Sequence, residues 1–320
     1  MSALDTLLSP VILFFILGVL AATVRSDLTI PEPIAKAMSL YLMASIGLKG
    51  GVQVSTVGFS PEMGLASVAG IILSFAIPLL AFALVRFIGG LDRLNAGAVA
   101  AHYGSVSIVT FVTATEALTR GGMAPAGYLV AVMALMETPA ILTGLILARS
   151  SGGKSPQPGR SHLLREVLFN GSVVMLLGSF IIGLIIGKTK FEAISPVFVS
   201  GFSGILCLFL LDMGLVAARR LRESKAISFR LASLGIVIPL LNGCIGLAVT
   251  MMIGLEQGTA AAFAILAASA SYIAVPAAVR MALPEADPGI YLPLSLAITF
   301  PFNIVIGIPL FTALASAFAN

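Results

Sequence analysis

The chain has 320 residues, of which 58% are hydrophobic and only 10% charged, with a mean hydropathy of +1.08. These values lie outside the range of soluble domains and inside that of proteins that cross a membrane several times. The net charge of +4 does not indicate nucleic-acid binding, because the sequence has no basic and aromatic patch. It therefore predicts an integral membrane protein embedded in the lipid bilayer.

Apolar runs of about 20 residues, the length that crosses about 30 Å of hydrocarbon, predict ten transmembrane helices and an all-α fold. The first run is expected to be retained as a span, because Arg25 follows it and no basic residue precedes it. In chain order the predicted spans cover residues 8–25, 33–50, 63–89, 94–119, 124–149, 164–187, 193–218, 228–254, 257–283 and 290–317.

The basic residues predict how these spans are oriented. The loops after spans 1, 3, 5, 7 and 9 share one side of the membrane and hold all but four of the 18 Lys and Arg residues. Cytoplasmic loops carry such an excess, so both termini are expected outside the cytoplasm. The four exceptions are Lys49, Arg120, Lys188 and Lys190.

Two halves, residues 1–149 and 164–320, are joined by a polar linker at 150–163 that is expected in the cytoplasm. Short segments of the halves resemble one another at offsets of 163 to 167 residues: 16–20 with 181–185, 45–48 with 212–215, 105–107 with 269–271, and 128–129 with 291–292. Because each half has an odd number of spans, the second must have the opposite orientation. This predicts the inverted repeat that builds many secondary transporters.

Span 4 contains the interruption 104–107, followed by a run rich in β-branched residues. Seven of the ten residues from 106 to 115 are Val, Ile or Thr, and we expect this run to be poor material for a regular helix. A bilayer tolerates a broken helix only where protein or a water-filled cavity supplies the missing hydrogen bonds. The break therefore predicts a binding site.

Span 9 is the repeat partner of span 4 and is expected to be broken as well, because Pro276 follows a Ser-rich segment. Two broken helices crossing near the midplane would present helix N-termini and hydroxyl groups, which suit a small, singly charged anion. The alternative is close helix packing through small residues. The candidate anion ligands are Gly104, Ser105, Ser107, Thr110, Ser269, Ser271 and Tyr272.

Glu137 is a carboxylate deep in span 5, next to Pro139, which should free a backbone carbonyl. We expect these hard oxygen ligands to bind Na⁺ as the coupling ion. The repeat counterpart offers neutral oxygens from Thr299 and Asn303. The alternatives are a structural carboxylate and ordinary interhelical hydrogen bonds. His102 could carry a proton or simply pack in the core.

These motifs resemble the sodium-dependent bicarbonate transporter family first known from cyanobacteria. The similarity covers almost the full length, and the most specific part is the run from Ala268 to Tyr291. Other matching landmarks are Ile46-Gly47-Leu48, Gly50-Gly51, Gly104-x-Val106-Ser107-x-x-Thr110, Glu137-x-Pro139-Ala140 and Met213-Gly214. Tyr272 and Glu137 each replace an aspartate of the cyanobacterial pattern, and Ser45 replaces a lysine, which leaves the number of sodium ions open.

The resemblance implies a gate unit of spans 1, 2, 6 and 7, a core unit of the other spans, and a homotrimer. It implies sodium-coupled bicarbonate uptake by elevator-like motion of the core, with the anion held between the breaks of spans 4 and 9. It also implies a PII-type regulatory protein at the cytoplasmic face, although the linker is shorter than is usual in the family. With this resemblance, the side of the membrane on which both termini lie is expected to be the periplasmic side of a bacterial inner membrane.

The sequence thus predicts a sodium-coupled symporter of bicarbonate. The alternatives are a symporter of another small monoanion, such as a short carboxylate, and an anion channel. An enzyme is not expected, because no nucleophile and base pair or catalytic motif is present.

Overall fold

The computed structural model describes residues 9–149, 171–223 and 227–317, and all regular elements in these ranges are helices. The predicted linker 150–163 and the start of span 6 lie outside the described residues. The first half contains α2 (Pro10–Thr23), α3 (Glu32–Val57), α4 (Pro61–Ala83), η1 (Leu84–Ile88), α5 (Arg93–Gly104), α6 (Ile108–Arg120) and α7 (Leu129–Arg149).

The second half begins with α9 (Gly171–Glu192), η2 (Pro196–Ser200), α10 (Phe202–Glu223) and α11 (Phe229–Met252), where η denotes a π-helical turn. Span 9 contains α12 (Gln257–Ala268) and α13 (Ala274–Ala282). The last span alternates α- and π-helical geometry and consists of α14 (Pro288–Leu292), η3 (Pro293–Thr299), α15 (Phe300–Phe302), η4 (Asn303–Gly307) and α16 (Ile308–Ala317).

Seven helical segments of the described chain are long and apolar enough to cross a membrane, so the multi-pass membrane prediction is confirmed. α2 and α12 are apolar but shorter, and α3 is long but carries Glu32, Lys36 and Lys49. A total of ten crossings therefore stays a prediction. The seven segments are Pro61–Ile88, Arg93–Arg120, Leu129–Arg149, Val174–Glu192, Pro196–Arg222, Phe229–Met252 and Pro288–Ala317.

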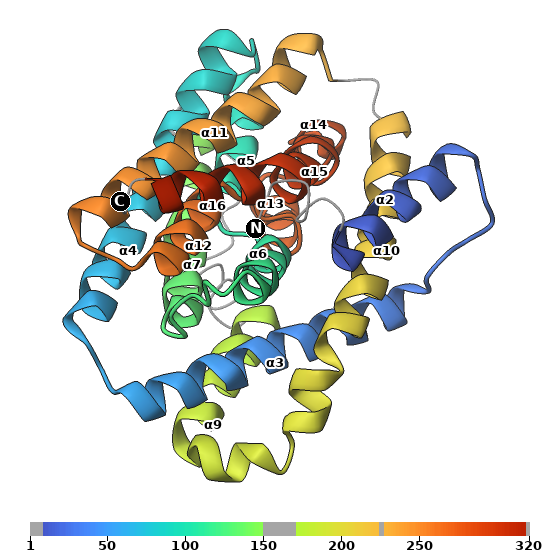
Figure 1. The fold of residues 1–320 in the computed structure, drawn as a ribbon. Coiled ribbons are helices and arrows are strands. Elements are labelled where there is room, and N and C mark those ends of the chain that lie inside the picture. Colours follow the sequence, from blue (N-terminus) through green and yellow to red (C-terminus); the bar gives the residue numbers. More distant parts are fainter. Residues whose placement is uncertain (1–8, 150–170, 224–226, 318–320) are drawn as a thin grey trace.

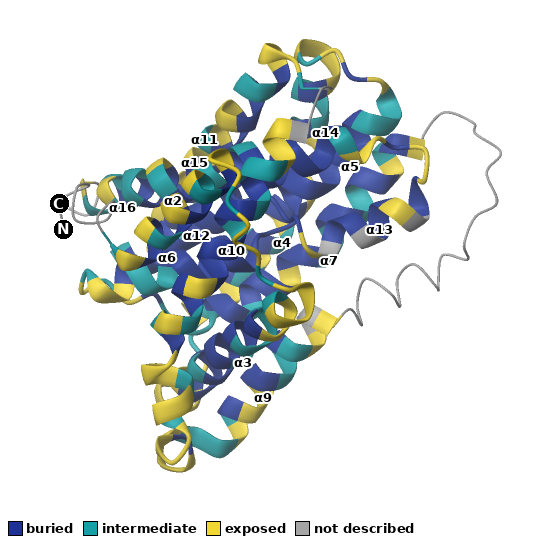
Figure 2. Ribbon diagram, turned by 90° about the vertical axis from the view of Figure 1, so that its right-hand side faces the viewer, coloured by how far each residue is buried: buried dark blue, intermediate teal, exposed yellow. Residues whose placement is uncertain are grey.

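The helices form two groups. α2 packs against α10, and α3 packs against α9; in Figure 1 these pairs occupy the right and lower edges of the drawing, and the other helices are gathered beside them. Residues from 96 to 104 of α5 and from 258 to 268 of α12 are all buried, and Figure 2 shows this burial as dark blue ribbon. These two half-span helices therefore lie at the centre of the second group.

Glycines allow the paired helices to approach closely. A Cβ atom on Gly18 of α2 would lie 2.1 Å from the carbonyl oxygen of Leu211 in α10. A Cβ atom on Gly183 of α9 would lie 2.3 Å from the carbonyl oxygen of Leu48 in α3. Small residues permit such backbone contact between membrane helices. Both glycines come from segments 16–20 and 181–185, which resemble one another in sequence, and both make the same kind of contact.

The expectation that the β-branched run after the first break would not form a regular helix is wrong. Residues 108–120 form α6, and residues 108–114 are all buried. The helix propensities of Val, Ile and Thr fall below that of Ala by less than about 0.7 kcal/mol per residue. Packing of the buried residues outweighs a deficit of this size.

The close contact at Gly183 can be tested against Gly178, which lies on the same helix and has no atom of the described residues within 4 Å of its Cβ position. We expect Gly183→Ala to lower the midpoint of thermal unfolding in detergent, because overpacking costs about 1–3 kcal/mol. Gly178→Ala should leave the midpoint unchanged or raise it through helix propensity. Equal effects of the two substitutions would show that the α3–α9 contact does not need the glycine.

Candidate functional site

The break in span 4 lies between α5 and α6, where the sequence predicts it. Ser105 and Ser107 have extended backbone, and Ser107 caps α6: its Oγ accepts hydrogen bonds from the Thr110 N–H at 3.2 Å and the Thr110 hydroxyl at 3.0 Å. Gly104 is needed for packing, because a Cβ atom there would lie 2.1 Å from Pro78. The local sequence therefore both ends one helix and starts the next.

The break in span 9 covers residues 269–273, between α12 and α13. The Ser269 hydroxyl donates a hydrogen bond to the Leu266 carbonyl at 2.8 Å and so caps the end of α12. Pro276 lies in the first turn of α13, where its missing N–H has no intrahelical acceptor to lose. The predicted break is confirmed. It lies in the Ser-rich segment and not at the proline.

Three hydrogen bonds join the two breaks. The Ser271 N–H donates to the carbonyl oxygens of His102 at 2.8 Å and Ser105 at 3.0 Å. The Ser107 N–H donates to the Ser269 Oγ at 2.8 Å. Backbone groups inside a membrane must be satisfied within the protein, and here each break supplies partners for the other. The prediction that spans 4 and 9 meet at their breaks is supported by these contacts.

A small cavity lies against both breaks and also against Glu137 of α7. Its volume of about 10 Å³ is enough for about one water molecule. Glu137 is 2% exposed, and the serines of the lining are equally buried. Any anion larger than one water therefore requires these walls to move apart. The lining consists of Val106, Ser107, Ile108, Glu137, Ser271, Tyr272 and Ile273.

Several hydroxyl groups of the breaks can still donate hydrogen bonds. Within the described chain, Ser105 Oγ and the Tyr272 hydroxyl are buried and have no hydrogen-bond partner. The Ser107 oxygen accepts two hydrogen bonds, which leaves its own proton able to donate. A buried unsatisfied polar group costs about 1–3 kcal/mol. A ligand or water that accepts these hydrogen bonds would remove that cost.

Glu137 is held in a helix that continues through Pro139. The Ser74 hydroxyl donates a hydrogen bond to the carbonyl oxygen of Met136, so a neighbouring helix satisfies a backbone group in the turn before the proline. Glu137 lines the small cavity together with Ser107 and Ser271 of the two breaks. Of the three predicted cation ligands, Glu137 is the one that the structure brings to the anion ligands.

Thr299 and Asn303 do not line this cavity. The Thr299 hydroxyl lies 2.7 Å from the Tyr103 hydroxyl and donates to the Gly235 carbonyl at 2.6 Å. The Asn303 side-chain NH₂ donates to the Ala268 carbonyl at 2.9 Å, at the end of α12. Both residues support the ends of the half-span helices. The Asn303 Oδ1, which has no partner within the described residues, is still able to bind a cation.

His102 and Tyr103 take part in the site in ways that the sequence did not predict. The His102 carbonyl accepts the hydrogen bond from Ser271, and its Nδ1 lies 2.7 Å from the Ala98 carbonyl. The His102 ring packs against Tyr291 with 4.8 Å between ring centroids. Their position directly before the break at Gly104 is the signal that could have identified both residues.

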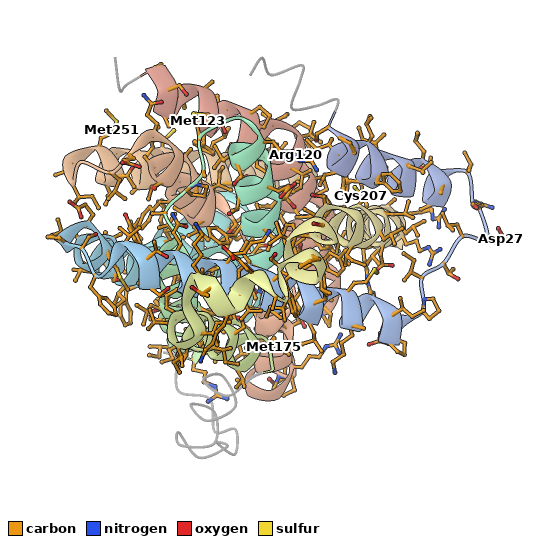
Figure 3. All side chains as sticks on the ribbon, turned by 60° about the horizontal axis from the view of Figure 1, so that its bottom comes forward. Asp27, Arg120, Met123, Met175, Cys207 and Met251 are labelled. Atoms are coloured by element: carbon orange, nitrogen blue, oxygen red, sulfur yellow. The ribbon has the colours of Figure 1, made fainter. Side chains whose placement is uncertain are left out.

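A charged cluster joins α6 to α10 at the far end of α6. Glu116 Oε1 accepts hydrogen bonds from Arg120 Nε at 2.7 Å and from the Ser203 hydroxyl at 2.6 Å. Lys49 Nζ lies 4.2 Å from the centroid of the Phe202 ring, a cation–π contact. Arg120, labelled in Figure 3, is the last residue of α6. The Glu116–Ser203 bond is thus a polar contact between the two groups of helices.

Comparison with protein families gives a match over nearly the whole chain. A family model described as the Na⁺-dependent bicarbonate transporter superfamily matches residues 10–316. None of the curated proteins compared with the chain matches it. The family resemblance predicted from the sequence motifs is confirmed, since the match includes both breaks and Glu137. The chain belongs to the Na⁺-dependent bicarbonate transporter superfamily.

Proposed function

We propose that the protein takes up bicarbonate together with sodium across the bacterial inner membrane. The observation that carries this proposal is the small buried cavity that Glu137 shares with Ser107 and Ser271 from the two breaks. Hydroxyl donors beside broken helices suit an anion, and a carboxylate suits a cation. Membership of the Na⁺-dependent bicarbonate transporter superfamily supports sodium and bicarbonate as this pair of ions.

The anion is held by the starts of α6 and α13 and by the hydroxyls around them. Each helix N-terminus carries a partial positive charge of about 0.5 e, and Ser105 and Tyr272 have hydroxyl groups that need a partner. Bicarbonate both donates and accepts hydrogen bonds, so it can pair with hydroxyls in either direction. A short carboxylate can only accept, and it is the alternative substrate of the same site.

The cation is held by Glu137, and its charge couples the two ions. An unneutralised carboxylate about 4 Å from a bound anion would repel it by about 4 kcal/mol at an effective dielectric constant of 20. Sodium bound at Glu137 removes this repulsion, so the anion binds well only when sodium is present. Asn303 would be a ligand of a second cation, which would lie outside the shared cavity.

Transport proceeds by elevator-like motion. α2, α3, α9 and α10 form the gate unit, and the remaining helices form the core unit that carries the site. The pairing of α2 with α10 and of α3 with α9 is what a two-fold inverted repeat of ten spans requires, because it pairs span 1 with 7 and span 6 with 2.

The surroundings of the protein follow from the same proposal. The gate unit forms a homotrimer in the inner membrane, and both termini lie in the periplasm according to the distribution of basic residues. A PII-type regulator would bind at the cytoplasmic face near residues 150–163. That segment lies outside the described residues, so the regulator stays a prediction.

The anion site predicts the effect of removing one hydroxyl. Ser271→Ala should raise the bicarbonate concentration for half-maximal uptake by roughly 10- to 100-fold, since a hydrogen bond to a charged group contributes about 1.5–3 kcal/mol. Adding Ser107→Ala should raise the bicarbonate concentration for half-maximal uptake further, but this substitution also removes the cap of α6. Uptake of labelled bicarbonate into proteoliposomes measures both effects.

Ser295→Ala is the matched control, because this buried serine bonds only the carbonyls of Tyr291 and Leu292 among the described residues and lies outside the cavity lining. It should leave half-maximal uptake unchanged. A folded Ser107→Ala, Ser271→Ala double variant with unchanged half-saturation would eliminate the proposed site.

The elevator motion predicts that linking the two units stops transport. Glu116 lies on the core and Ser203 on the gate, so we expect a short bifunctional thiol reagent joining Glu116→Cys to Ser203→Cys to abolish uptake. A reductant that cleaves the reagent should restore it. The native Cys207 and Cys244 are first replaced with serine.

The control pair is Glu116→Cys with Arg120→Cys, which lie on one helix and therefore within one unit. Linking this pair should leave uptake nearly intact. Equal uptake by both linked proteins would contradict relative motion of the two units.

A further inference from the structure

A second cavity, of about 440 Å³, opens between α2, α10 and the last span. Val19 and Ala22 of α2, Ala217 and Arg222 of α10, and Ala297 and Pro301 of the last span are among the residues that line it. Since one water needs about 10–15 Å³, this cavity has room for a hydrated ion. The small cavity at the breaks has no room for a hydrated ion.

The second cavity lies at the basic end of α10. The Arg222 guanidinium belongs to its lining and donates one hydrogen bond, from Nη1 to the Ala22 carbonyl at 3.2 Å. Arg219 bonds the Leu28 carbonyl at 2.9 Å in the loop after α2. The positive-inside rule assigns this end to the cytoplasm. An anion in the cavity would therefore meet a fixed positive charge.

Three buried aromatic rings, one of them at the site, are in contact in a row. The ring centroids of Phe15 and Phe300 are 5.5 Å apart, and those of Phe300 and Tyr272 are 5.1 Å apart. All three side chains are buried. Tyr272 lines the small cavity at the breaks, so the row begins at the site.

The other end of the row adjoins the second cavity. Phe300 lies between Ala297 and Pro301, which both line that cavity. Phe15 lies one helical turn before Val19, on the same face of α2. Phe300 is thus a chain neighbour of residues that line the second cavity, and its ring contacts Tyr272 of the site and Phe15 of α2.

We propose that the second cavity is the inner vestibule of the transport path, that Arg222 binds the anion there, and that the row Phe15–Phe300–Tyr272 is the barrier between vestibule and site. This inference rests on the proposed function. The anion leaves the breaks when the contact between Phe15 of the gate and Phe300 of the core opens. Arg222 then receives it in a hydrated space.

Two features favour an anion over the acyl chain of a phospholipid, the other occupant that an apolar lining could accept. Arg222 is among the residues that line the cavity, and two other lining residues, Ala297 and Pro301, lie close to Phe300 in the chain. A lipid tail would need neither. The two occupants differ in one measurable property, which is whether water reaches the cavity wall.

Cysteine accessibility tests the vestibule without any transported ion. In full-length protein with Cys207→Ser and Cys244→Ser, a cysteine is placed at Ala297 in the vestibule or at Ser271 in the site. A charged, membrane-impermeant methanethiosulfonate is added to inside-out vesicles. We expect Ala297→Cys to react readily and Ser271→Cys to react slowly, because the aromatic row lies between them.

Removing the barrier should expose the site. Adding Phe300→Ala should speed the reaction of Ser271→Cys by about tenfold or more, because a large buried side chain is lost. Phe302→Ala removes another buried ring from the same short helix, outside the row. It should not speed the reaction of Ser271→Cys. Phe300→Leu replaces Phe300→Ala if the latter fails to fold, as judged by gel filtration.

Other results would overturn the proposal. If Ala297→Cys reacts only with a lipid-soluble maleimide, an acyl chain fills the cavity. If Phe300→Ala and Phe302→Ala expose Ser271→Cys equally, the aromatic row is not the barrier. Both readouts are independent of sodium and bicarbonate, so a failure here is distinct from a failure of the proposed function. An Arg222→Gln variant with unchanged bicarbonate efflux kinetics would remove the role of Arg222.

Discussion

Two broken helices inside a membrane protein must find hydrogen-bond partners for the backbone groups that the breaks expose. Here they find them in each other: the Ser271 N–H is bound to two carbonyls of span 4, and the Ser107 N–H is bound to the Ser269 hydroxyl. Neither break could be kept without the other, because each would leave buried donors unpaired. The paired breaks, which hold the site, therefore fix the arrangement of the half-span helices around them.

This constraint also explains the polar residues farther from the breaks. Asn303 bonds the last carbonyl of α12, and Tyr103 bonds Thr299 on the last span. Thr299 is the last residue of η3 and Asn303 is the first residue of η4, so both lie in π-helical turns of the last span at the level of the breaks. Interruptions of this kind often occur at functional sites. Most polar groups near the centre thus support the helix ends, and few are left to bind ions.

The residues that line the small cavity account for the proposed coupling. Glu137 is the carboxylate at the cavity that Ser107 and Ser271 share, so the charge that would attract sodium is the same charge that would repel an anion. The binding of each ion therefore depends on the binding of the other. With room for about one water, the cavity also keeps the site closed in this conformation. The aromatic row then separates it from the basic end of the protein.

Much of the fold and part of the site could be predicted from the sequence. The offset between Ser105–Ser107 and Ser269–Ser271 indicated which helices pair, and small polar residues indicated where they break. The helix α6 was missed, because intrinsic propensity understates what packing of Val109 or Val112 contributes. The backbone role of His102 was missed as well, since a carbonyl carries no residue-specific signal. Thr299 was predicted as a cation ligand because of its hydroxyl oxygen. In the structure this hydroxyl is hydrogen-bonded to the Tyr103 hydroxyl and the Gly235 carbonyl, which the sequence could not indicate.

The coupling of the two ions through Glu137 is the central claim. Its most direct measurement is the uptake of labelled bicarbonate into proteoliposomes with an inward sodium gradient, and with choline in place of sodium, for the native protein and Glu137→Gln. Native uptake should require the sodium gradient, and the variant should need a higher sodium concentration for half-maximal uptake because the cation loses its charged ligand. Native uptake that continues unchanged in choline, or an unchanged sodium dependence of the variant, would contradict this account.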